Sequence, residues 1–135
     1  HWQTGVMTRW QPWLVELQPS MFVEMSKELA DLKQVANGDI VSVKSARGQV
    51  DAVAIVTGRF KPLNIAGTTV HEVGIPWHYG WVTTAQRKYG SKDKKPELFT
   101  FGDSANLVTP NIGDANTMIP ESKAFMVDVV RKEGC

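Results

Sequence analysis

The feature that most constrains the fold is residues 39–57, DIVSVKSARGQVDAVAIVT, in which apolar and polar residues alternate on both sides of a turn near Arg47–Gly48. The alternating apolar positions are Val41, Val43, Val50, Ala52, Ala54 and Val56. A period of two on both sides of a turn predicts a β-hairpin. Because Val53 and Ile55 make the second strand apolar on its other face too, we expect that strand to be central in a sheet or inside a closed barrel.

The remaining periodic segments predict short elements. Residues 26–38 predict a helix that Ser26 caps, with Leu29 and Leu32 on one face, ending at Asn37–Gly38. Two prolines in residues 11–22 predict a loop leading into a short extended segment. Short strands are expected near residues 63–65 and 69–73, joined by a turn at 66–67, and a final strand is expected in AFMVDVVRK, residues 124–132.

These elements amount to one or two brief helices and about six short strands, which predicts a mainly β domain of the barrel type with short peripheral helices. Regular periodicity is lost from Trp77 to Thr109. A loop of that length inside a compact domain is usually functional or mobile. The basic run RKYGSKDKK in this loop is interpreted first as solvated surface and second as a docking patch.

Bulk properties exclude several classes of function. The chain has 135 residues, 42% of them apolar, which suits one domain with one core. A net charge of +1 gives no electrostatic sign of nucleic acid or anionic membrane, and no apolar stretch is long enough to insert in a bilayer. The single cysteine, Cys135, can form no intramolecular disulfide. A chain that starts at His1 without an initiator Met is expected to be a piece of a longer protein or a processed subunit.

No motif for nucleophilic catalysis, phosphate cradling or helical zinc binding is present, and no carboxylate or nucleophile–base pair stands out. His71 is predicted to be a packed or surface residue. His78, in GIPWHYGW, belongs either to a packed aromatic corner or to a wall for a planar ligand. The polar cluster in GDSANLVTPN is explained by Asx turns or by ligand binding. Three polar, aromatic-edged loops predict a site for a large, polar, partly planar ligand.

Four blocks in order carry a family resemblance: HWQTGVMTRW, NGDIVSVKSARGQVDAVAIVT, HEVGIPWHYGW and GDSANLVTPNIGDANTMIPESKAF. Together they resemble the C-terminal domain of the large subunit of formate dehydrogenase, in the molybdopterin oxidoreductase family. The resemblance implies a six-stranded double-psi β-barrel. It also implies that residues 1–135 form a single domain, the C-terminal piece of a longer catalytic subunit.

The same resemblance implies a set of residues that contact a bis-molybdopterin guanine dinucleotide cofactor carrying Mo or W. The opening loop would lie against one dinucleotide, Trp77 and His78 would lie beside the cofactor, and Asn106 would hydrogen-bond it. Ser122 and Lys123 would approach it before the last strand. The implied cofactor-binding residues are His1, Trp2, Gln3, Thr4, Gly5, Met7, Thr8, Trp77, His78, Asn106, Ser122 and Lys123.

By resemblance, the catalytic groups, the metal ligand and the iron–sulfur cluster belong to upstream domains, so no catalytic or metal-binding residue is assigned here and the segment alone is expected to be inactive. The implied reaction is oxidation of formate to CO2, with electrons passed to iron–sulfur clusters and an iron–sulfur electron-transfer subunit. A periplasmic location is expected, with the cytoplasm as the alternative. There are two other hypotheses. One is a free-standing barrel used as a binding or assembly module. The other is the same domain in a nitrate or polysulfide reductase, and the block GIPWHYGW argues against this second one.

Overall fold

The computed structural model describes residues 11–77, 79, 102–122 and 124–132, and it is mainly β, as predicted. Its helices are α1 (Pro12–Leu17), α2 (Lys27–Lys33) and the 3-10 helix η2 (Ala105–Leu107). Its strands are β1 (Phe22–Met25), β2 (Ile40–Lys44), β3 (Gln49–Val56), β4 (Leu63–Ile65), β5 (Thr68–Val70), β6 (Val73–Gly74) and β7 (Asp128–Arg131). No helix within these ranges is long and apolar enough to cross a membrane.

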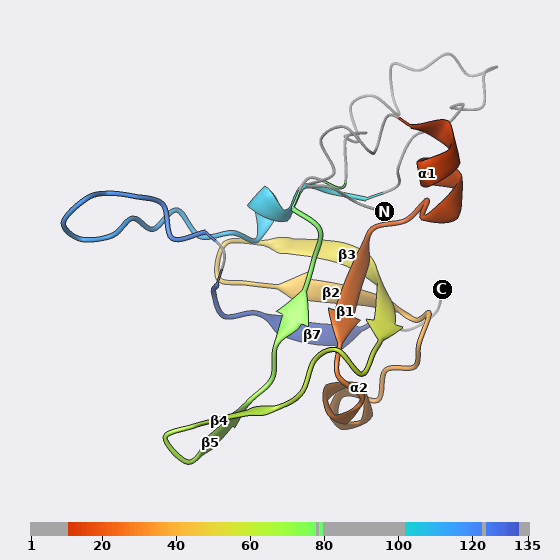
Figure 1. Ribbon diagram of the computed structural model, residues 1–135, viewed down its shortest axis with the longest axis horizontal. Coiled ribbons are helices and arrows are strands. Elements are labelled where there is room, and N and C mark those ends of the chain that lie inside the picture. The colour runs from red at the N-terminus through yellow and green to blue at the C-terminus, as the bar shows by residue number, and fades with distance from the viewer. Residues whose placement is uncertain (1–10, 78, 80–101, 123, 133–135) are drawn as a thin grey trace.

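Five of the strands form one sheet in the order β6, β1, β3, β2, β7, which curls like half of a barrel (Figure 1). Strands β1 and β3 are parallel, and the other neighbouring pairs are antiparallel. The connection between the parallel strands runs through α2 and β2, since parallel neighbours cannot be joined by a tight turn. The central position of β3 confirms the expectation drawn from its apolar residues on both faces. Strands β4 and β5 form a separate hairpin.

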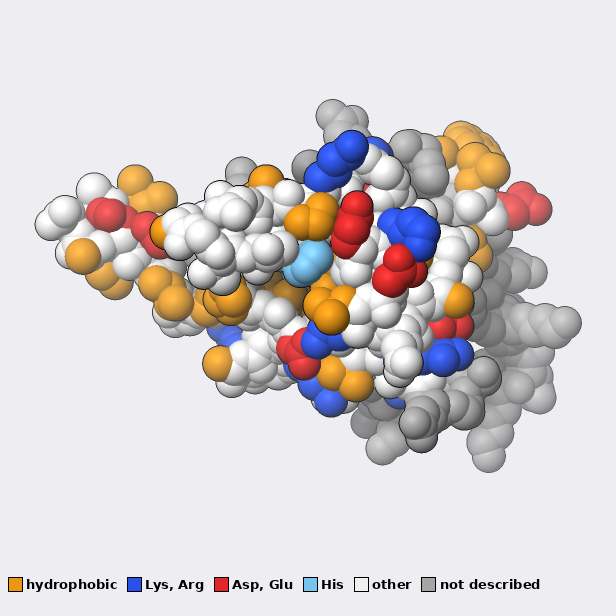
Figure 2. All heavy atoms as spheres, turned by 90° about the horizontal axis from the view of Figure 1, so that it is seen from below, with side chains coloured by type: hydrophobic (Ala, Val, Ile, Leu, Met, Phe, Trp, Pro, Cys, Tyr) orange, Lys and Arg blue, Asp and Glu red, His pale blue; other side chains and the backbone are white. Residues whose placement is uncertain are grey.

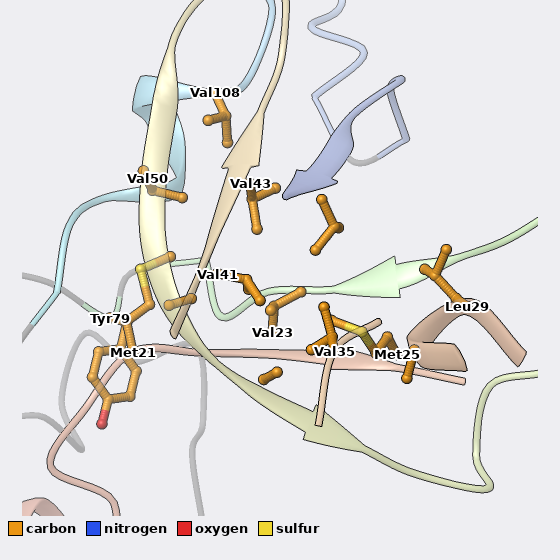
Figure 3. Close-up of a cluster of buried hydrophobic side chains, with 14 residues drawn as sticks. Met21, Val23, Met25, Leu29, Val35, Val41, Val43, Val50, Tyr79 and Val108 are labelled. Carbon is orange, nitrogen blue, oxygen red and sulfur yellow. The ribbon is translucent and has the colours of Figure 1, made fainter. Parts of the chain in front are cut away.

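The core lies on one face of this sheet, where alternate residues of neighbouring strands meet (Figure 3). Val43 is paired with Val50 of β3 and, on its other side, with Val129 of β7. Val23 of β1 is paired with Ala54 of β3 in the same way. All five side chains are buried, so the alternation read from the sequence corresponds to one buried face.

Three local predictions were wrong in ways that have physical causes. Residues 12–17 are helical because Pro12 occupies the first helical turn, where its missing N–H costs no hydrogen bond. Helix α2 begins after the predicted cap Ser26 but ends at Lys33, because Gln34 adopts a left-handed conformation with φ 54°. Leu32 is 66% exposed, and the buried pair on α2 is Leu29 and Ala30.

The last strand is shorter than expected. Of the three apolar residues predicted to alternate within it, Val129 alone lies in β7. Phe125 and Val127 precede the strand and are partly buried against the core.

Candidate functional site

Several loops meet at one end of the sheet, because strand direction fixes which connections lie there. Parallel strands β1 and β3 both begin at this end, so the antiparallel strands β2 and β6 end at it and β7 begins at it. The turn between β2 and β3 and the segment that follows β6, which contains Trp77, therefore lie at the same end of the sheet. A contact between Gly48 in that turn and Leu107 adds η2 to the same end.

Helix η2 is fixed in place by three interactions. Ser104 Oγ accepts a hydrogen bond from the Asn106 N–H at 3.3 Å. The buried Thr109 hydroxyl donates to the Ala105 carbonyl at 2.8 Å, and Val108 is fully buried in the core beside Val50 (Figure 3). A short helix held in this way presents its remaining side chains in a fixed direction.

The contact at Gly48 requires glycine. A Cβ at this position would lie 2.8 Å from the Leu107 carbonyl oxygen, which is closer than a real Cβ approaches. The neighbouring Arg47 is exposed, and no ion pair to it is found among the residues that the structure describes. This turn was predicted from the sequence but its contact with η2 was not, because nothing local in the sequence reveals a partner about sixty positions away.

Asn106 is the predicted site residue that the structure displays most clearly. Its side chain is exposed on η2, and in the described part of the chain its amide has no hydrogen-bond partner. A free amide can donate and accept at once, which suits the polar edge of a planar ligand.

Some of the other predicted site residues lie in the described ranges, and the rest lie outside them. Trp77 is half-buried in the turn after β6, at the same end of the sheet as Asn106. Ser122 is half-buried between the bridge at Pro120 and β7, and no contact between it and Asn106 is found among the described residues. The remaining predicted residues lie outside the described ranges, and they are His1, Trp2, Gln3, Thr4, Gly5, Met7, Thr8, His78 and Lys123.

Tyr79 supports this end of the domain from inside. It is fully buried, its ring packs edge-on against Phe22 with centroids 6.0 Å apart, and its hydroxyl donates to the Gln18 carbonyl. Burial raises the pKa of Tyr79, so the hydroxyl stays protonated and remains a donor. Of the two interpretations of the aromatic cluster, a packed corner or a wall for a planar ligand, the packed corner therefore applies to Tyr79.

Gly102 packs against Met21, the residue before β1. Its φ is +149°, and a Cβ there would lie 2.4 Å from Met21 Cβ, so only glycine fits. Tyr79 and Gly102 thus bring residues distant in sequence to the start of β1.

The groups gathered at this end are hydrogen-bonding and planar rather than metal-ligating. They comprise an amide, an indole and polar backbone, while no three His, Cys, Asp or Glu side chains gather anywhere in the described ranges. Such groups fit a large polar ligand whose atoms need many hydrogen-bond partners. His71, predicted as a packed or surface residue, is partly exposed, and its buried Nδ1 has no partner within the part of the chain described.

Fold and site together define a β-rich ligand-binding domain whose polar loops meet at one end of a curled sheet. The sequence profile of the molybdopterin dinucleotide binding domain matches residues 1–126, and the chain belongs to this family.

Several relatives similar to most of the chain are subunits of formate dehydrogenases. The chain is 53% identical over 97% of its length to formate dehydrogenase subunit alpha of Megalodesulfovibrio gigas. It is 45% identical over 96% to formate dehydrogenase 2 subunit alpha (cytochrome c-553) of Nitratidesulfovibrio vulgaris. It is 46% identical over 83% to the nitrate-inducible formate dehydrogenase major subunit of Escherichia coli. The aligned part is 12%, 11% and 10% of these relatives, so the chain spans about a tenth of their length.

Proposed function

We propose that this domain binds the bis-molybdopterin guanine dinucleotide cofactor of a formate dehydrogenase and closes over one side of it. The observation that carries the proposal is the Asn106 amide, which is exposed on η2 and has no hydrogen-bond partner in the described part of the chain. The family membership supports the ligand class. Five formate dehydrogenase subunits match 83–97% of the chain at 40–53% identity, whereas a nitrate reductase and an F420-dependent formate dehydrogenase subunit each match less than half of it at 39% identity.

In this proposal the chain binds and orients, and it carries no catalytic group. Asn106 and Ser122 offer hydrogen bonds to the polar atoms of the dinucleotide, and Trp77 offers an apolar face that excludes water. The opening segment with His1, Gln3 and Thr4 completes the contact as the resemblance implies. When bound, the cofactor supplies the Mo or W redox chemistry that converts formate to CO2.

The wider assignments belong to the same proposal. Residues 1–135 form one domain, the C-terminal piece of a longer catalytic subunit, and the finer fold is a six-stranded double-psi β-barrel. The iron–sulfur cluster lies in the upstream part of that subunit, and electrons leave through an iron–sulfur partner subunit during anaerobic respiration. The proposed location is the periplasm.

The first test is the content of Mo, W and guanine dinucleotide in the native full-length protein, purified without oxygen. Stoichiometric metal and dinucleotide on a polypeptide much longer than this chain are expected. A native chain of this length with neither metal would contradict the proposal and favour a free-standing binding module.

The residue-level test replaces Asn106 with Ala in the full-length protein. Loss of one hydrogen bond costs about 1 kcal/mol, or about fivefold in affinity, so retained dinucleotide should fall after dialysis. Asn116→Ala is the matched control, because Asn116 is also an exposed asparagine but lies in a separate turn. Equal retention in the two variants would remove Asn106 from the site.

A further inference from the structure

Residues 111–121, here called the arm, project from the sheet between η2 and β7 (Figure 1). The arm folds back on itself through backbone hydrogen bonds. The Asp114 N–H donates to the Ile119 carbonyl at 2.9 Å, and the Glu121 N–H donates to the Ile112 carbonyl at 2.9 Å. A β-bridge pairs Gly113 with Pro120.

Polar groups close the tip of the arm. Asp114 Oδ1 accepts from the backbone N–H groups of Asn116 and Thr117 at 3.1 and 2.8 Å, and from the Thr117 hydroxyl at 2.8 Å. Met118 follows with a left-handed φ of 56°. The arm is therefore shaped by its own hydrogen bonds rather than by packing on the core.

Large apolar side chains on the arm are nevertheless exposed to solvent. Ile112 is 55% exposed, Met118 is 74% exposed and Ile119 is 64% exposed. The arm also carries the acidic residues Asp114 and Glu121 and has no lysine or arginine. Figure 2 shows hydrophobic side chains beside acidic ones at this projecting end. An arm shaped in advance loses little conformational entropy when its apolar side chains become buried, which is a property of docking elements.

We propose that the arm docks into an apolar groove with a basic rim on the remainder of the same catalytic subunit. This inference rests on the proposed function, in that it takes the chain to be one domain of a longer polypeptide. The relatives supply the first argument, because the matched part is 12% of the M. gigas subunit and most of that polypeptide lies outside it.

The ends of the arm supply the second argument. It begins five residues after Asn106 and ends directly before Ser122, so predicted cofactor-binding residues lie on both sides of it in the sequence. A cofactor enclosed between this domain and the rest of the subunit brings that remainder to the base of the arm. Pairing of two arms from two copies is disfavoured, because it would bring Asp114 and Glu121 of each copy together.

The test measures the accessibility of the Met118 thioether in the wild-type holoenzyme. Brief treatment with dilute hydrogen peroxide, followed by peptide mass spectrometry, gives the oxidation rate of each methionine relative to the urea-denatured protein. We expect Met118 to be protected at least about tenfold in the native holoenzyme, because its side chain would be buried in the groove. Oxidation of native Met118 within about threefold of the denatured rate would overturn the proposal.

A second measurement identifies what covers the arm. The same oxidation is repeated on the catalytic subunit after its partner subunits have been removed. Protection that persists places the groove on the same polypeptide, whereas protection that disappears assigns it to another subunit and overturns the proposal. Metal and dinucleotide content is measured in parallel, so a failure of the proposed function is distinguished from a failure of docking.

A pair of variants tests the apolar contact itself. Ile119→Asp places a charge among the apolar side chains and should abolish the protection of Met118. Asn116→Asp adds the same charge at an exposed polar position of the same turn and should leave the protection unchanged. Equal protection in both variants would contradict burial of Ile119.

Discussion

Gly48 is the residue at which the β2–β3 turn meets η2, and it should position Asn106. Replacing it with Ala puts a Cβ 2.8 Å from the Leu107 carbonyl oxygen, so the backbone of η2 must shift. We expect Gly48→Ala to destabilise the domain by about 1–3 kcal/mol and to lower retained dinucleotide in the full-length protein. Thermal unfolding and dinucleotide content after dialysis measure the two effects.

Gly58→Ala is the control for this substitution, because nothing lies within 4 Å of its Cβ position and its φ is not in the left-handed region. It should leave both measurements near the wild-type values. Dinucleotide retention in Gly48→Ala equal to that in Gly58→Ala would show that the contact does not position the site.

At the residue scale, the sequence predicts chemical types better than it predicts roles. The cluster in GDSANLVTPN was explained by Asx turns or by ligand binding, and in the structure one of its residues, Ser104, caps η2. Thr109 looks equally available in the sequence, yet it is buried and bonded to the Ala105 carbonyl. Separating the exposed amide of Asn106 from the structural hydroxyl of Thr109 requires knowing which side of η2 faces the core.

Asp114 controls the shape of the arm at the scale of one element. Hydrogen bonds from the Thr117 hydroxyl, and then from the backbone of Thr117 and Asn116, hold the pKa of Asp114 below its usual 3.8. A depressed folded pKa means that the stabilisation is present above 3.8 and is lost as the pH falls through the folded pKa. Asp114→Ala should therefore loosen the turn at neutral pH, measured as faster amide hydrogen exchange at Thr117. Unchanged exchange would show that the bridge between Gly113 and Pro120 holds the arm by itself.

Elements were predictable where the pattern is local and continuous. The strands β2 and β3 follow from strict alternation, and the turn at Gly67 follows from the type of residue there. The end of α2 does not, because Gln34 takes a left-handed conformation that asparagine and glycine usually take. The short helix α1 was missed because two prolines were interpreted as breaking it, although one of them begins it.

Across the whole molecule, three ion pairs attach the edge strand β7 and its following residue to the rest of the domain. Lys33 on α2 pairs with Asp128 at 2.5 Å, Arg131 pairs with Asp39 at 2.9 Å, and Lys132 pairs with Asp51 of β3 at 2.8 Å. All are partly exposed to solvent, so each contributes no more than about 1 kcal/mol. The sequence shows these charges but not their pairing, which depends on β7 lying beside β2 at the sheet edge.

Acid should weaken the attachment of β7 to the rest of the domain. A hydrogen bond from Lys33 lowers the pKa of Asp128. Partial burial tends to raise the pKa of Asp51, but hydrogen bonds from Lys132 and Ser42 outweigh burial, so the pKa of Asp51 is lowered as well. Both carboxylates therefore stabilise the fold above their usual 3.8, and this is lost as the pH falls through the folded values. In urea unfolding of the 135-residue chain, the double variant Asp51→Asn with Asp128→Asn should be less stable than wild type by about 1–2 kcal/mol at neutral pH. The difference should shrink markedly by about pH 3, since wild type then loses the same interactions. A difference that stays constant with pH would mean that packing of Val129, rather than charge, holds β7 in place.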